Sequence, residues 1–398
     1  MRIPAGVPST DIVHAKTATT RSTDCALGGQ KEMPVRESFS HSSAIKRLHV
    51  IGPPSWVVEE FRHGLERGSG GRNHPGRDDS WHISAHDGLS PVIDLTDGDG
   101  LWSSPGSLIA LGDWRRRAGL PRPRVKAPPA DVMARLPYSL TRHHIVVAHA
   151  RDILSGQAFT GSPSPSWTFP DDLEQRPWSR VASGRVGGFR AARRTATDLR
   201  TALSESPGES LIEISENVEG LVEEWCAIVD PADAAVLACC GTCVHRRAGG
   251  ADIITVFDGA RFEASHRAAV MATASTIGAT LRAILRPPPS QTPIGTSLRG
   301  SQGSGVDTAT SPPPVSLLLA FRGGSPEPVV LEIDPVWCTT PYPFGPKGMN
   351  AFADAIRRCR VDASSSAEPF EWIPDPWMTR EFARRYRGFP TPVGETHA

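Results

Sequence analysis

Two carboxylates in one predicted strand are the first candidates for chemistry in this chain. Glu332 and Asp334 lie in the run VVLEIDP, and side chains two residues apart in a strand emerge on the same face. Leu331 and Ile333 would then face the core. Two carboxylates on one strand face can share a Mg²⁺ ion, which prefers hard oxygen ligands. The alternative is an ordinary solvated strand face.

A second acidic set surrounds a predicted turn, and a basic segment precedes it. The acidic residues are Glu213, Glu216, Glu219, Glu223 and Glu224, and taken alone such a set is most often a polar loop. Residues 180–194 contain five Arg, three Gly and no acidic residue. Glycines let backbone N–H groups approach phosphate oxygens, and Arg adds a bidentate charge. The segment is a candidate phosphate-binding loop, with a solvated basic loop as the alternative.

Cysteine and histidine residues cluster twice without forming a recognisable site. The run 239–245, CCGTCVH, contains a C-x₂-C pair but no second ligand pair at zinc-finger spacing, and it alternates like a buried strand, so structural thiols are favoured. His143, His144 and His149 lie on one predicted strand, and alternation sends them to both faces. We therefore assign these histidines no role.

Composition excludes several classes of protein. The chain has 398 residues with 43 Lys+Arg and 43 Asp+Glu, so no net field favours binding to nucleic acid or to an acidic membrane. The continuous apolar runs are shorter than the ~18 residues of a membrane span. The N-terminus lacks a secretory apolar stretch, and seven thinly spread Cys fit reduced thiols. We expect a cytoplasmic protein that spans no membrane; the oligomeric state is not indicated.

The elements that must position these residues follow from hydrophobic periodicity and turn formers. They predict an α/β chain with a disordered arm over 1–43, a small α/β pre-domain over 44–130, a larger domain over 131–360 and a tail over 361–398. A flexible insertion rich in Pro, Gly, Ser and Thr is expected at 287–314. Strands are expected at 48–51, 91–95, 211–215, 222–230, 234–244, 253–257, 315–321 and 328–334, those from 211 to 257 forming one antiparallel sheet. Helices are expected at 55–65, 107–120, 265–285 and 350–359, a helix-turn-strand pattern at 131–154, and a short helix docked by its aromatic residues in the tail.

Common nucleotide-binding and hydrolase motifs are missing, but the order of elements resembles a known superfamily. The chain has no GxxxxGK[ST], no GxGxxG after a strand, no GxSxG and no HExxH. The segments DVMARLPYSLTRHHIVVAHARD (131–152), ENVEGLVEEWCAIV (216–229) and VLEIDPVWCTTPY (330–342) resemble motifs of the ATP-grasp superfamily. More narrowly, they are similar to actinobacterial ATP-grasp domain-containing proteins of unassigned substrate. The resemblance covers about residues 130–360, the larger domain.

The resemblance implies an ATP- and Mg²⁺-dependent ligase that activates a small-molecule or peptide carboxylate as an acyl phosphate for attack by an amine. It places Glu216 and Val218 at the adenine hinge, Glu224 on the ribose or metal side, and Glu332 at Mg²⁺. Asp334 stands where the family usually has Asn, and an oxygen ligand is kept. Phosphate contacts would come from residues in the basic segment: Arg185, Gly187, Gly188 and Arg190. No catalytic residue is indicated.

The sequence also departs from the family pattern. Ala182 stands where the family has a phosphate-binding Lys, no Lys occurs between residues 127 and 346, and Arg is not a conservative replacement. Cys226 replaces an Arg, and Ser316 or an adjacent Leu replaces a metal-binding Asp. Two hypotheses therefore stay open: an active carboxylate–amine ligase, and a catalytically silent ATP-grasp-like binding or scaffold protein.

Overall fold

The computed structural model describes residues 46–66, 81–86, 93–96, 98–156, 177–184, 189–248, 251–256, 262, 264–286, 311–362, 365 and 368–385. All of these residues belong to one unit defined by contacts, Ser43–Ala398. The predicted arm at 1–43 and residues 287–310 of the predicted insertion lie outside the described residues.

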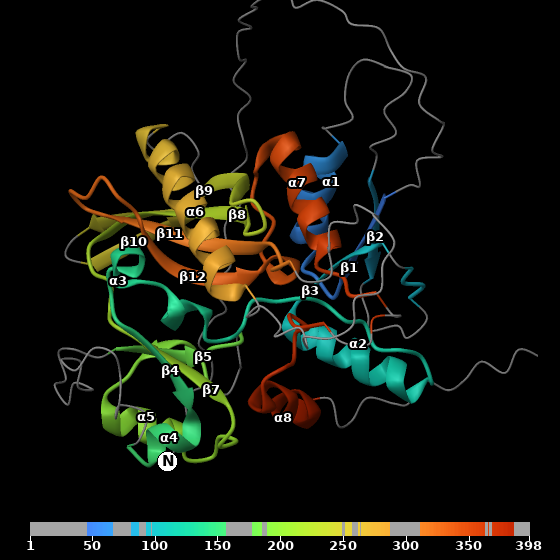
Figure 1. The fold of residues 1–398 in the computed structure, drawn as a ribbon, viewed down its shortest axis with the longest axis horizontal. Coiled ribbons are helices and arrows are strands. Elements are labelled where there is room, and N and C mark those ends of the chain that lie inside the picture. The colour runs from blue at the N-terminus through green and yellow to red at the C-terminus, as the bar shows by residue number, and fades with distance from the viewer. Residues whose placement is uncertain are drawn as a thin grey trace, which may run out of the picture. The chain divides into compact units, whose positions relative to one another are not determined.

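A three-stranded parallel sheet with the order β2-β1-β3 begins the described chain (Figure 1). The predicted strand–helix opening is confirmed. The strand predicted at 91–95 is wrong, because residues 93–96 have no regular structure and the strand that pairs with β1 begins only at Gly100. The elements of this part are β1 (Lys46–Ile51), α1 (Ser55–Glu66), β2 (Trp81–His86), β3 (Gly100–Ser103) and α2 (Pro105–Arg117).

A five-stranded antiparallel sheet has the order β10-β9-β8-β11-β12. β11 lies between β8 and β12, so two strands that are distant in the chain flank the same neighbour. The predicted hairpin of the last two strands is confirmed. The strands are β8 (Leu221–Asp230), β9 (Ala235–Ala248), β10 (Ala251–Val256), β11 (Val315–Arg322) and β12 (Val329–Pro335).

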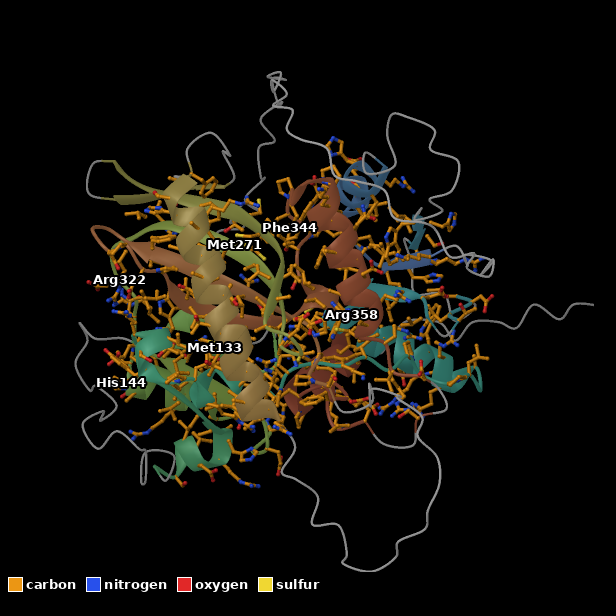
Figure 2. All side chains as sticks on the ribbon, turned by 45° about the horizontal axis from the view of Figure 1, so that its top comes forward. Met133, His144, Met271, Arg322, Phe344 and Arg358 are labelled. Atoms are coloured by element: carbon orange, nitrogen blue, oxygen red, sulfur yellow. The ribbon has the colours of Figure 1, made fainter. Side chains whose placement is uncertain are left out.

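The long helix α6 (Ala264–Leu285) covers one face of this sheet (Figures 1 and 2). A stripe of side chains at helical spacing is completely buried against the strands, while Met271 lies on the outer side. Among the described helices, Ser265–Leu285 is long and apolar enough to cross a membrane, judged by length and composition alone. The segment contains no continuous apolar run of that length. In the structure this helix is a layer of the core. The buried stripe consists of Val270, Ala274, Ile277 and Leu281.

A four-stranded antiparallel sheet has the order β4-β7-β5-β6. The helix-turn-strand pattern predicted at 131–154 is confirmed in outline. The prediction that the strands between residues 211 and 257 form one sheet is wrong. β7 belongs to this four-stranded sheet, and residues 216–220 carry the chain from it to β8. The elements are η2 (Val132–Arg135), α3 (Tyr138–Thr141), β4 (Ile145–His149), α4 (Ala150–Leu154), β5 (Trp178–Val181), β6 (Ala192–Arg193), α5 (Ala196–Leu203) and β7 (Leu211–Ser215).

A bulge in β12 changes which of its apolar residues reach the core. Leu318 pairs with Glu332 but the next residue, Leu319, pairs with Val330, so Leu331 is skipped. Val330 and Ile333 are buried under α6, whereas Leu331 is only half-buried. The prediction that Leu331 faces the core is therefore wrong, because simple alternation does not include the bulge.

The C-terminal elements connect the three sheets. α7 (Gly345–Arg358), whose two ends are marked by Phe344 and Arg358 in Figure 2, packs on α1, where Phe352 stacks on Phe61 with ring centroids 5.7 Å apart. η6 (Val336–Cys338) lies between β12 and α7. The predicted tail helix is α8 (Pro376–Arg385), and its Trp377 packs on the core of the four-stranded sheet. The helix predicted in the tail is thus confirmed.

Candidate functional site

The side chain of Arg180 joins the four-stranded and five-stranded sheets. It lies on β5, where register sets it opposite Glu213 of β7. Its Nε donates to Glu213 Oε1 at 2.8 Å, and its Nη1 donates to Glu332 Oε1 of β12 at 2.5 Å. The exposed fractions of the side chains are 20% for Arg180, 6% for Glu213 and 30% for Glu332. The two sheets are thus held together by a charged contact that is mostly removed from water.

Electrostatics keep this guanidinium charged. Burial works to lower the pKa of Arg180, but attraction by Glu213, Glu332 and Asp334 outweighs it, and the pKa is raised above its usual value. Three carboxylates therefore act on the guanidinium of Arg180 at the junction of the sheets.

A cavity of about 210 Å³ lies next to this charged group. Its polar wall includes Arg180, Glu213, Asp334 and Glu371. Met133 and Phe370 form part of its apolar wall. The site therefore combines a few convergent charged groups with apolar walls, an arrangement typical of small-molecule sites.

Glu332 and Asp334 lie on one face of β12, as the alternation of the strand predicts, because the bulge precedes both residues. Both act on Arg180, Glu332 through the hydrogen bond and Asp334 through its charge. Asp334 lines the cavity directly. The role of these two residues as metal ligands stays a prediction.

The residues of the predicted phosphate-binding segment are only partly described. Arg185, Gly187 and Gly188 lie outside the described residues. Arg190 is exposed and is not among the cavity-lining residues, and its carbonyl accepts a hydrogen bond from Arg194 Nη2 at 2.7 Å. The arginine that the structure brings to the carboxylates is Arg180, at the start of the same basic segment. Sequence reasoning missed it because only the register of β5 against β7 reveals the pairing.

The two predicted hinge residues lie where the chain leaves the four-stranded sheet. Glu216 extends the pairing of β4 and β7: its N–H donates to His144 O at 3.0 Å, and its Oε2 accepts from His144 N at 2.8 Å. Val218 is half-buried in the connection to β8. The two hydrogen bonds to the backbone of His144 explain the position of Glu216. Adenine binding by Glu216 or Val218 stays a prediction.

Glu224 lies apart from the cavity, although it shares a sheet face with Glu332. Glu224 pairs with Ala320, two residues from the Leu318 that pairs with Glu332. Strand spacing and rise put the two Cα atoms roughly 12 Å apart across β11. Glu224 Oε1 lies 2.7 Å from His245 Nε2 and is not among the cavity-lining residues. Glu224 and Glu332 therefore belong to two neighbouring clusters.

The positions that depart from the family pattern lie between these clusters or at the cavity. Ala182 lines the cavity. Cys226 Sγ and Ser316 Oγ are 3.4 Å apart and buried, on the sheet face that also carries Glu332. Burial raises the pKa of the Cys226 thiol to about 12, so this pair is neutral at physiological pH.

Comparisons with known proteins give similarity in structure alone. No protein-family model matches the chain, and no curated protein sequence matches it. The VanG D-Ala:D-Ser ligase from Enterococcus faecalis matches with a TM-score of 0.39 and 12% identity, over 79% of this chain and 98% of that one. A D-alanine–D-alanine ligase from Bacillus anthracis complexed with ATP matches with a TM-score of 0.35 and 10% identity, over 80% and 97%.

The ATP-grasp ligase PsnB, complexed with a minimal precursor, matches with a TM-score of 0.34 and 13% identity, over 79% of this chain and 99% of that one. At these TM-scores and identities, the similarities carry no assignment of residues or substrate. The chain's own topology is an α/β unit followed by two antiparallel sheets that a charged contact joins. This order of sheets agrees with the ATP-grasp-like fold that the sequence resemblance predicts.

Proposed function

We propose that the chain is an ATP-grasp-like ligase that binds a magnesium nucleotide at the junction of its two antiparallel sheets. One observation carries this proposal: Arg180, Glu213 and Asp334 converge on the same cavity, and Glu332 lies within hydrogen-bond distance of Arg180. The positive guanidinium can attract the phosphates of a nucleotide, and the negative carboxylates can bind the metal ion that accompanies it.

The residues present fit the magnesium nucleotide that the resemblance implies. Asp334 and Glu332 offer carboxylate oxygens, the ligands that Mg²⁺ prefers. Arg180 offers a fixed guanidinium whose geometry suits phosphate oxygens. Glu213 holds this guanidinium in place with its own carboxylate. When bound, the metal would neutralise phosphate charge between these groups.

The proposed reaction joins a carboxylate to an amine or similar nucleophile. A carboxylate oxygen attacks the terminal phosphorus of ATP, the bond to ADP breaks, and an acyl phosphate forms. The nucleophile then attacks the acyl carbon and phosphate leaves. In this scheme Arg180 stabilises the negative charge on the transferred group, and the apolar wall around Met133 and Phe370 excludes water.

A catalytically silent protein is the second candidate, and a specific observation favours it. Arg180 already binds the carboxylates of Glu213 and Glu332, so its charge is shared before any phosphate arrives. The chain also has no Lys between residues 127 and 346. Under this alternative, the junction is a structural ion-pair network and the cavity serves binding alone.

Product formation distinguishes the two candidates. The full chain is incubated with Mg²⁺, ATP and pooled carboxylates and amines, with hydroxylamine added to trap acyl phosphates. The ligase proposal predicts release of ADP that depends on a carboxylate and falls at least ~100-fold in Arg180→Met. The control Glu327→Gln, at an exposed residue of the β11–β12 turn, keeps the activity. Nucleotide binding without any release of ADP would favour the silent protein.

A further inference from the structure

A cluster of three potential metal ligands lies on the five-stranded sheet, apart from the cavity. Cys243 and His245 are two residues apart on β9, so their side chains project from the same face. Glu224 of β8 pairs directly with Cys243 and therefore shares this face. The register of two adjacent strands thus brings a thiol, an imidazole and a carboxylate together.

The three side chains are close enough to bind one ion. His245 Nε2 lies 2.7 Å from Glu224 Oε1, and the three ligand atoms all lie within 4.8 Å of one another. The side chains of His245 and Glu224 are 13% and 19% exposed, and Cys243 is half-buried. The cluster is therefore largely shielded from water but still reachable by an ion.

The donor set has the chemistry of a zinc-type site. Thiolate, imidazole and carboxylate are the three ligand types that Zn²⁺ takes from proteins, and sites with three protein ligands leave a fourth position for water or another molecule. A softer donor such as Cys243 also disfavours Mg²⁺ and Ca²⁺, which prefer oxygen. The cluster is thus chemically distinct from the carboxylates Glu332 and Asp334.

Sequence spacing hides this site. A C-x₂-C pair without a second pair of ligands argues against a zinc finger, and Cys240, the other member of that pair, is indeed buried in the core. The missing ligand comes from the neighbouring strand, nineteen residues before Cys243 in the chain. Only the pairing of β8 with β9 places Glu224 beside Cys243.

We propose that Glu224, Cys243 and His245 form a binding site for a divalent transition metal of the zinc type. The site is independent of the proposed nucleotide site, because it shares no residue with Arg180 and its carboxylates. Glu224 then serves as a metal ligand on this face of the sheet, in place of the ribose contact implied by the family resemblance.

Metal binding by the full chain tests the site without any nucleotide. The protein is freed of metal with a chelator and titrated with Zn²⁺, and then with Co²⁺, whose absorption reports a bound thiolate. We expect one equivalent to bind, with affinity reduced at least ~10-fold in Glu224→Gln and His245→Gln and more in Cys243→Ser. The control Cys338→Ser, at a half-buried Cys of η6, binds as the wild type does. Absence of binding, or equal binding by all variants, would overturn the proposal.

A second measurement uses the wild-type chain and avoids any loss of folding in a variant. Alkylation of each Cys is followed by mass spectrometry with and without Zn²⁺. The proposal predicts that Zn²⁺ slows alkylation of Cys243 at least ~10-fold and leaves Cys338 unaffected. Equal rates at Cys243 with and without Zn²⁺ would contradict it, whatever the outcome for nucleotide binding.

Discussion

Arg180 donates a hydrogen bond to Glu332 at 2.5 Å, and this contact joins β5 of the four-stranded sheet to β12 of the five-stranded sheet. The same guanidinium binds Glu213 within its own sheet. The side chain of Arg180 therefore connects the two sheets, because it binds one carboxylate in each of them. The proposed nucleotide site depends on this link, since Asp334 and the cavity lie beside it.

Removing the guanidinium leaves two carboxylates without a partner. Arg180→Met is expected to lower the free energy of unfolding by about 3 kcal/mol, because Glu213 in particular is buried. Urea unfolding of the full chain measures this change. The control Arg190→Met, at an exposed position of the same segment, is expected to change stability by less than ~0.5 kcal/mol. Equal stability of the two variants would show that the link is not structural.

The charge of Glu332 explains part of that loss. Adding Glu332→Gln to Arg180→Met removes one of the unpaired carboxylates, so the double variant is expected to recover about 1 kcal/mol relative to Arg180→Met alone. A double-mutant cycle measures the coupling. Strict additivity of the two substitutions would mean that the 2.5 Å contact has no energetic weight.

A glycine in α6 permits the close approach of this helix to the sheet. A Cβ at Gly278 would lie 2.7 Å from Val229 Cγ1 and 3.2 Å from the backbone Cα of Ala234. Gly278→Ala is therefore expected to cost about 1–3 kcal/mol despite the better helix propensity of Ala. The matched control is Gly112→Ala in α2, where the nearest atom is 3.8 Å away and a gain of about 0.5–1 kcal/mol is expected. Differential scanning calorimetry of both variants checks the opposite signs.

Buried histidine makes stability depend on pH. Burial lowers the pKa of His49 below 6.5, even though its Nε2 lies 3.3 Å from Asp99 Oδ2. Below pH 6.5 the unfolded chain binds a proton at this residue while the folded chain does not. Stability is therefore expected to fall as the pH drops from 6.5 towards the lowered pKa, by up to ~1.4 kcal/mol per pH unit.

The slope of stability against pH isolates this residue. His49→Gln is expected to reduce the slope of stability against pH between pH 6.5 and 5. His143, whose pKa is also lowered by burial, contributes to the slope that remains. Denaturant unfolding at several pH values provides the measurement. An unchanged slope in His49→Gln would contradict the assignment.

Local pattern predicted much of this molecule, and the failures have a common physical cause. The shared face of Glu332 and Asp334 follows from strand alternation alone. The pairing of Arg180 with Glu213 and that of Glu224 with Cys243 depend on register between strands separated in the chain, which no local pattern specifies. The bulge that exposes part of Leu331 and the transfer of β7 to a second sheet are likewise tertiary effects. Hydrophobic periodicity therefore predicted most of the strands and the shared face of Glu332 and Asp334. It did not predict which side chains pair across neighbouring strands.

Calorimetric titration with ATP and Mg²⁺ tests the central claim most directly. The account predicts that the wild type binds the nucleotide and that Glu327→Gln binds it equally well. Asp334→Ala and Glu332→Gln are each expected to lose at least ~1.4 kcal/mol of binding free energy, about tenfold in affinity. Loss of the heat signal when Mg²⁺ is withheld is also expected. No binding by the wild type, or equal binding by all four proteins, would contradict a nucleotide site at the junction of the sheets.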